Sequence, residues 1–459
     1  MIRSVVGMWG IVVIAGLLAS GGPARAADPA APSIESLPAY LASWDLGRSD
    51  WTALAGPGGW NESKQSLVFR LMARVARIPA DRAVRWEADA PDVSGSLPDA
   101  AGDGFVRIRG RAILVAPCHL SGDDAAVAGR PSLDLVRVAT GAGGLVDVIV
   151  ESAPAAWPQW TAIDEPVSVV GLPLGTGAGP VPEGEGHAWP AEPHGLLMLG
   201  SRLSWYPATV LGGLGMDYAT FDTVADGKPL VAGDTEAFFG LLAAVGKASP
   251  GAIAAAAGPQ ADIIPIIDPS ERWFESHRGE PVTIEGVARR ATRIAIDDPE
   301  RRRQVGADHY WELYVFVPTQ PIRVNTRVQD DFPVVCCVRS LPEAMPTGER
   351  IGERVRVSGF ALKRYAYSLP RVRVRSSQGD EELPAGRRET PLFIGETANW
   401  LPAPSSRSFA GDLGWVLLGI AAVVGLVLVA AAWSFNRGSR RAAAAAKRRL
   451  PDRIELPPG

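Results

Sequence analysis

The stretch ERVRVSGFAL, residues 353–362, decides the fold prediction, because a near copy of it, EPVSVVGLPL, occurs at residues 165–174. Valine alternates with polar residues in both stretches, which is typical of a half-buried β-strand. Each stretch then reaches a glycine, Gly171 or Gly359, and a glycine inside a strand often marks a bulge or a sharp bend. We therefore interpret both stretches as strands that bend at the glycine.

Two further pairs of stretches match in the same order along the chain. GFVRIRGRA, residues 104–112, aligns with EPVTIEGVA, residues 280–288, and LMLGSRLSWYPA, residues 197–208, aligns with LFIGETANWLPA, residues 392–403. Three matches in one order indicate an internal duplication of a β-domain of roughly 100–120 residues.

Each copy contains about five short strands, and five strongly bent strands suit a small closed barrel of the OB type. The spacing also permits a pair of β-sandwich domains, which stays open as an alternative. Helical patterns interrupt the strands: Asn61 is placed to cap a helix that Pro79 ends, and Asp234 is placed to cap TEAFFGLLAAVGKA. The predicted fold class is therefore mainly β with a helical insert (α+β), built from two OB-like five-stranded barrel repeats.

The N-terminus has the features of a secretory signal peptide. Arg3 precedes an apolar stretch from Val5 to Ala19, and an A-x-A site ends at Ala26. The apolar stretch is shorter than the roughly 20 residues that a membrane-spanning helix needs. We predict cleavage after Ala26 and export of the residues that follow.

The C-terminus predicts a membrane span at residues 413–435, which carry no charged side chain. Trp415 and Trp433 lie near its ends, where indoles favour the membrane interface. Seven Lys and Arg residues follow the span, so the positive-inside rule places the tail in the cytoplasm. The signal peptide and this rule agree on a single-pass cell-membrane protein whose bulk is extracytoplasmic.

These observations give a complete domain organisation. It comprises a signal peptide (1–26), a linker and amphipathic helical region (27–100), OB-like domain 1 (101–208), a helical insert (209–278), OB-like domain 2 (279–403), a linker (404–412), a transmembrane helix (413–435) and a basic cytoplasmic tail (436–459).

The layout resembles a group of envelope proteins of planctomycete-type bacteria. The resemblance rests on the signal peptide, the paired β-domains, the single C-terminal span and the stretches DHYWELYVF, GERVRVSGFALKRYAY and PLFIGE. It implies a location in the cell envelope and supplies no catalytic residues.

The stretch HYWELYVF, residues 309–316, divides into two strand faces. Trp311, Leu313 and Val315 form an apolar face that we expect inside the barrel. The opposite face carries Tyr310 and Glu312, and it either binds a ligand across the barrel or packs under a neighbouring domain.

The basic residues after Val355 combine with tyrosines in the way that single-stranded nucleic acid binders do. Against this, the exported side of a membrane offers little nucleic acid, and nearby acids can neutralise the patch. The candidate ligand or partner surface comprises Tyr310, Glu312, Tyr314, Lys363, Arg364, Tyr365, Tyr367, Arg371, Arg373 and Arg375.

Catalytic and metal-binding motifs are absent from the sequence. No P-loop, HExxH, GxSxG or Rossmann glycine run occurs, and the 5 histidines are dispersed. The 3 cysteines form no CxxC pair, which favours buried thiols over zinc, although Cys118 and either Cys336 or Cys337 leave a disulfide open. The sequence indicates no cofactor and no metal.

Charge also gives little guidance, since 46 basic and 50 acidic residues leave a net charge of −4. We expect a non-catalytic envelope protein whose two OB-like domains bind a protein or glycan partner or scaffold an assembly. A membrane-anchored hydrolase acting on envelope polymers stays open, as does anion or single-stranded nucleic acid binding through residues 363–375.

Overall fold

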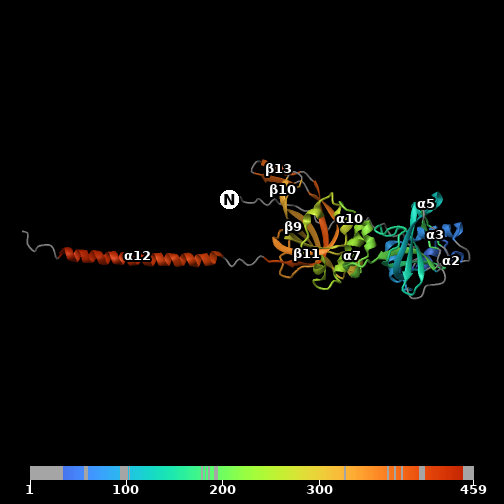
Figure 1. Cartoon of the computed structure of the whole chain (residues 1–459), viewed down its shortest axis with the longest axis horizontal. Helices are drawn as coiled ribbons and strands as arrows, with labels where there is room; N and C mark the ends of the chain where they lie inside the picture. Colours follow the sequence, from blue (N-terminus) through green and yellow to red (C-terminus); the bar gives the residue numbers. More distant parts are fainter. Residues whose placement is uncertain are drawn as a thin grey trace, which may run out of the picture. The chain divides into compact units, whose positions relative to one another are not determined.

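The computed structural model describes residues 35–55, 60–93, 102, 104–176, 179–180, 182–184, 187–190, 195–324, 327–369, 372–376, 379–383, 386–402 and 409–447. The chain divides into two compact units, Met1–Leu401 and Pro402–Gly459 (Figure 1). The predicted signal peptide, residues 1–26, lies outside the described residues.

The first unit begins with a set of short helices. They are α1 (Leu37–Ala42), α2 (Arg48–Ala55), α3 (Glu62–Val75) and α4 (Ala80–Ala88). The prediction of a capped helix is confirmed for α3, because the Asn61 side chain accepts a hydrogen bond from the backbone N–H of Lys64. The helices bury one apolar face against the outside of the barrel that follows.

The first barrel closes from five strands in the order β1-β2-β3-β7-β4. β3 and β7 pair in parallel, and the other neighbours pair antiparallel. Its strands are β1 (Val106–His119), β2 (Ser132–Thr140), β3 (Leu145–Val150), β4 (Glu165–Thr176) and β7 (Leu196–Trp205). The connections hold α5 (Gly122–Ala128) and the small pair β5 (Glu183–Gly184) and β6 (His187–Ala188).

The helical insert, residues 209–278, follows the first barrel. Its elements are α6 (Val210–Gly213), η2 (Tyr218–Thr223), η3 (Ala232–Asp234), α7 (Thr235–Val245), α8 (Ala252–Ala257), α9 (Ile263–Ile267) and α10 (Trp273–His277). The predicted helix α7 is present and Asp234 is its N-cap residue, but the Asp234 side chain makes no capping hydrogen bond to this helix. Asp234 ends η3, and its carboxylate accepts from the backbone N–H groups of Ala225 and Val231 instead.

The second barrel closes in the order β8-β9-β10-β14-β11. Its strands are β8 (Pro281–Ala295), β9 (His309–Val324), β10 (Arg327–Ser340), β11 (Glu353–Leu369) and β14 (Gly386–Trp400). The connections hold α11 (Pro299–Val305) and the hairpin of β12 (Val372–Ser376) and β13 (Gly379–Leu383). Because both large sheets close on themselves, the alternative of two β-sandwich domains is wrong.

The two barrels share strand order, strand direction and register. β10 and β14 pair in parallel, as β3 and β7 do. Gly110 lies opposite Val167 between β1 and β4, and the aligned Gly286 lies opposite Val355 between β8 and β11. Positions that align in the sequence therefore occupy equal places in the two barrels.

The repeated strand glycines are required by close backbone contact. A Cβ atom added to Gly171 would lie 2.2 Å from the carbonyl oxygen of Leu199, and one added to Gly359 would lie 2.6 Å from that of Ile394. The strand register shifts at both glycines, as expected where a strand bends. Steric exclusion of a side chain therefore explains why each repeated stretch has a glycine at this position.

A tryptophan–glutamate hydrogen bond also occurs once in each barrel. The indole Nε1 of Trp205 donates to Glu165 over 2.7 Å, and that of Trp400 donates to Glu353 over 2.8 Å. Each bond joins the start of the fourth strand of its barrel to the end of the fifth. The same hydrogen bond is therefore found at the same corner of both barrels.

We expect Trp205→Phe and Trp400→Phe to lower the free energy of unfolding by similar amounts, about 1 kcal/mol each, because each removes one partly buried hydrogen bond. The shift in denaturant midpoint of the full-length chain measures this effect. Trp44→Phe, at a more exposed position, should change the midpoint little. A large effect at only one of the two corners would contradict their equivalence.

Each barrel has an apolar interior and an outer face covered by helices. Trp157 and the valines of β2 and β3 lie in the first interior, while Leu313 and Val315 lie in the second, as predicted. The helical insert covers the outer face of the second barrel, where Phe238 and Leu242 of α7 join its apolar cluster. The outer faces of both barrels are therefore buried in large part within the unit.

The cysteines are buried free thiols in the described part of the chain. Cys336 points into the second barrel and its neighbour Cys337 points to the outer face, as alternation along a strand requires. Burial raises the pKa of the thiols of Cys118 and Cys336 to about 12, so both stay protonated and poorly reactive.

The second unit contains one long helix, α12 (Phe409–Lys447), which Figure 1 shows as a single continuous rod. Its segment Leu417–Arg441 is long and apolar enough to cross a membrane. The helix extends beyond both ends of the predicted span at residues 413–435 and includes the alanine-rich start of the basic tail. A single C-terminal span is consistent with membrane anchoring.

Candidate functional site

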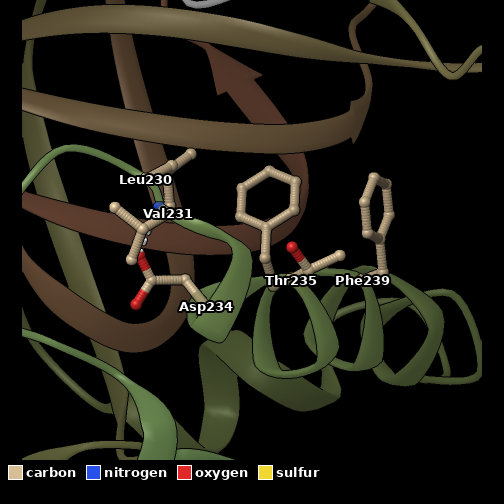
Figure 2. Close-up of a pocket in the computed structure, with 6 residues that line it drawn as sticks. Leu230, Val231, Asp234, Thr235 and Phe239 are labelled. Carbon is tan, nitrogen blue, oxygen red and sulfur yellow. Dashed lines mark hydrogen bonds between the residues drawn. The ribbon is translucent and has the colours of Figure 1, made fainter. Parts of the chain in front are cut away.

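The predicted basic surface begins with a lysine that the structure buries completely. Lys363 on β11 is 0% exposed, and its Nζ donates to the Asp234 carboxylate over 2.7 Å and to the Pro229 carbonyl over 3.2 Å. Burial lowers the pKa of Lys363, and the hydrogen bond to Asp234 partly offsets this. Figure 2 shows Asp234 at the start of α7, close to Val231. Lys363 therefore holds the helical insert on the second barrel.

The backbone beside Lys363 also binds the insert. The N–H of Gly227 donates to the carbonyl of Arg364, and the N–H of Ala366 donates to the carbonyl of Lys228. Asp226 accepts from the N–H of Arg364 and forms an ion pair of 2.6 Å with Arg278. The stretch KRYAY, residues 363–367, thus attaches the insert along β11. This attachment was not predicted from the sequence.

Other basic side chains of the predicted surface have acidic neighbours. Arg364 forms an ion pair with Glu389 at 2.8 Å, and Arg354 and Arg356 both bind Glu285. These pairs neutralise the arginine side chains of this stretch that the structure describes.

The remaining three predicted arginines are less completely described. Arg371 lies outside the described residues, as do the side chains of Arg373 and Arg375. The hairpin register places these two positions opposite Glu382 and Asp380, respectively.

The predicted tyrosine platform is buried under the helical insert. Tyr310, Tyr314 and Tyr365 are each under a tenth exposed, and Glu312 is 0% exposed. The ring of Tyr310 packs against Phe238 of α7 with the centroids 5.4 Å apart. Of the two interpretations of this face, the structure therefore shows the packed one; Tyr367 lies at its edge and stacks on Tyr365.

Glu312 and Tyr314 form an unsatisfied polar cluster with the buried Arg290 of β8, and we call it the Glu312 cluster. Both Glu312 carboxylate oxygens, both terminal nitrogens of Arg290 and the Tyr314 hydroxyl lack a hydrogen-bond partner among the described residues. The guanidinium of Arg290 lies over the Tyr314 ring, 5.4 Å from its centroid, and Arg290 itself is 3% exposed. Such groups are costly inside a protein, and most buried polar atoms are paired.

Burial changes the ionisation of the Glu312 cluster. Removal from water raises the pKa of Glu312 to about 7, although the positive charge of Arg290 acts in the opposite direction. Burial also raises the pKa of the Tyr314 hydroxyl above its usual value. The only ionic partner of Arg290 in the described part of the chain is Glu349, at 3.1 Å from Nε. Glu312 is the group in this cluster that titrates near neutral pH.

The first barrel has different residues at the positions that correspond to the Glu312 cluster. In each barrel a bulge in the first strand sets the next pair, which is Leu114 opposite Arg137 in the first and Arg290 opposite Tyr314 in the second. Leucine therefore stands where the second barrel has a buried arginine.

The same correspondence places Leu135 where the second barrel has Glu312. Leu135 lies two residues before Arg137, and Glu312 lies two residues before Tyr314. The buried Arg137 of the first barrel binds both carboxylate oxygens of Asp147, at 2.8 and 2.9 Å. The first barrel thus forms in the same register with a leucine in place of Glu312, and its buried arginine, Arg137, is paired with a carboxylate.

The second barrel also has an open groove, which we call the α9 groove, of about 560 Å³. It lies between α9 and β9, where β9 bulges against β10 after Pro318. Its lining combines apolar Ile263, Ile264, Ala261, Val317 and Pro318 with polar Gln260, Asp262, Thr319 and Gln320. The Thr319 hydroxyl is buried and has no partner among the described residues.

None of the groove residues was predicted as a site residue, nor was Arg290. The aligned pair Ala112 and Ala288 can be extended by two residues, and Leu114 then aligns with Arg290. This change from leucine to arginine is the one feature of the sequence that points to the Glu312 cluster. The groove has no such signal, because its two walls are far apart in the chain.

No protein-family model matches this chain, and no curated protein matches it.

Proposed function

We propose that the chain is a membrane-anchored extracytoplasmic binding protein that carries two OB-type barrels. The order of five strands, with one parallel pair between the third and the fifth, supports an OB-type fold for both. The equal registers and the repeated Trp–Glu bonds support an origin by internal duplication. The function is binding and assembly rather than catalysis.

The proposed topology places both barrels outside the cell membrane. It is supported by the apolar segment of α12 and by the basic residues Arg437, Arg440 and Arg441 near its end, which favour the cytoplasmic side. The predicted signal peptide acts in the same direction. The resemblance to envelope proteins of planctomycete-type bacteria fits this location.

The proposed ligand is an envelope glycan, and the proposed binding site is the α9 groove. The observation that carries this proposal is the groove itself, of about 560 Å³ with the exposed Gln320 in its wall. This volume lies within the range of about 300–1,000 Å³ found for ligand sites. Amide and carboxylate groups beside apolar side chains suit sugar hydroxyls and ring faces, and Gln260, Asp262 and Gln320 supply these polar groups.

The pairing of the basic stretch weighs against nucleic acid as the ligand. Among the described residues, Lys363, Arg364 and Arg356 already bind carboxylates within the unit, so these three cations are not free to bind a phosphate backbone. A glycan or protein partner therefore fits the described surface better.

We expect Gln260→Ala and Gln320→Ala, at exposed amides of the groove, to weaken glycan binding roughly tenfold each, the effect of losing about one hydrogen bond. The test is saturation-transfer NMR of the full-length chain in nanodiscs with soluble oligosaccharides released from the envelope. The matched control, Gln159→Ala, removes an exposed amide of the first barrel and should leave binding unchanged.

Equal binding by all four proteins, or binding by none, would overturn the groove assignment. Capture of an envelope protein by the same wild-type sample without any glycan signal would favour the protein-partner alternative. Depolymerisation of the oligosaccharides would favour the membrane-anchored hydrolase.

A further inference from the structure

The Glu312 cluster lies at the contact between the second barrel and its helical cover. Glu312 stands on the outer face of β9, two residues from Tyr310, whose ring packs on Phe238 of α7. Glu312 is completely buried although neither of its oxygens has a partner among the described residues. Tyr310 and Tyr314, on either side of Glu312 along β9, belong to the apolar cluster that Phe238 and Leu242 of α7 join. An ionised carboxylate in this place requires water or a new donor, so its ionisation favours a state in which this packing opens.

The surroundings of Glu312 contain few groups that can absorb its charge. The titratable and charged groups around it are Arg290 on β8, Tyr310 and Tyr314 on β9, Cys337 on β10, Tyr365 and Tyr367 on β11, and Glu349 before β11. Arg388 on β14 faces Tyr367. Helix α7 carries one charged residue, Glu236, which binds Arg301 of α11.

The first barrel shows that this polar cluster is not needed to form the fold. Leu135 and Leu114 occupy the positions of Glu312 and Arg290, and the barrel closes in the same register. The carboxylate therefore adds a property that the second barrel has and the first lacks.

We propose that Glu312 is a proton-binding site that couples extracytoplasmic pH to the closure of the helical insert over the second barrel. Protonated, Glu312 is neutral and stays buried beside Tyr310, which packs on α7. Ionised, it gains hydration when the insert loosens, and this uncovers the tyrosine face of Tyr310, Tyr314 and Tyr365. The extracytoplasmic location rests on the proposed function, whereas the coupling itself depends only on the described contacts. The pKa of Glu312, raised by burial to about 7, places the change near neutral pH.

Hydrogen exchange of the full-length chain in nanodiscs tests this coupling, with rates corrected for the intrinsic effect of pH. The α7 amides, residues 235–245, should exchange about tenfold faster at roughly pH 8 than at about pH 6 in the wild-type chain. Glu312→Gln, which stays neutral, should abolish this difference. Amides of α3 supply an internal reference that should not respond.

Glu285→Gln is the matched control, because its pairs with Arg354 and Arg356 lower the pKa of this glutamate and keep it ionised over the whole range. It should keep the wild-type response. A pH-independent α7 in the wild-type chain, or a response that survives in Glu312→Gln, would overturn the proposal. Glycan binding is measured separately, so failure of the groove assignment leaves this result interpretable.

Discussion

An Asp234→Ala variant is expected to lose about 3–5 kcal/mol of the free energy of unfolding, the largest effect among the substitutions considered. The change leaves the ammonium of Lys363 buried without its carboxylate partner. It also frees the N–H groups of Ala225 and Val231, which Asp234 accepts from. Denaturation of the full-length chain in detergent, followed by tryptophan fluorescence, measures the loss.

Two further variants make the Asp234 result specific. Asp268→Ala removes an exposed aspartate whose carboxylate accepts from the N–H and hydroxyl of Ser270, so it should change stability by less than about 1 kcal/mol. Lys363→Met in the Asp234→Ala background should recover part of the loss, because it replaces an unpaired charge with an apolar chain of similar length. A loss below about 1 kcal/mol in Asp234→Ala would show that the pair does not hold the insert.

A Glu312→Leu variant is expected to be more stable than the wild-type chain by about 1–3 kcal/mol at pH 8. Leucine is the residue that the first barrel has at this position, Leu135, and it has no polar atoms to desolvate. The same denaturation experiment, repeated at several pH values, measures the gain.

The pH dependence of this gain has a definite sign. Burial raises the pKa of Glu312 to about 7, so the folded chain holds the proton more tightly than the unfolded chain does. Its contribution to stability is therefore full below the ordinary glutamate pKa and is lost as the pH rises through about 7. The advantage of Glu312→Leu should thus shrink towards pH 5.

Glu271→Leu, at an exposed glutamate, supplies the control and should change stability by less than about 0.5 kcal/mol at either pH. Destabilisation by Glu312→Leu at pH 8 would show that the carboxylate makes a stabilising contact and would remove the basis for the proton-binding site.

Much of the barrel architecture is predictable from the repeated stretches. Alternating valines identify strands, and Gly171 and Gly359 mark the places where the backbones of neighbouring strands approach too closely for a side chain. The aligned positions then place Trp205 and Trp400 at equal corners. These features follow from local sequence patterns and from comparison of the two copies in one chain, so they can be predicted from the sequence.

The candidate site is less predictable, because it depends on contacts between segments far apart in the chain. Tyr310 and Lys363 have the composition of an exposed binding surface, yet the insert covers both. Asp234 has the position of a helix cap, but a buried lysine and two backbone N–H groups compete for its carboxylate. Burial of this kind is set by tertiary packing, which strand periodicity does not report.

The stretch KRYAY illustrates the difference. It has no counterpart in the first barrel, where Gly175 takes the place of Lys363 at the matching bulge. In the sequence, Lys363 belongs to the candidate ligand or partner surface. The structure shows that it attaches the helical insert, through one buried ion pair and backbone hydrogen bonds.

The most direct measurement of the proposed function is site-specific photo-crosslinking in cells whose envelope glycans carry a metabolic label. A photoreactive side chain at Gln320, in the wall of the α9 groove, should yield a labelled glycan adduct. The same side chain at Glu349, on the exposed loop of the same barrel, should yield little. Equal labelling at both positions, or adducts at Gln320 that contain only protein, would contradict glycan binding in the groove.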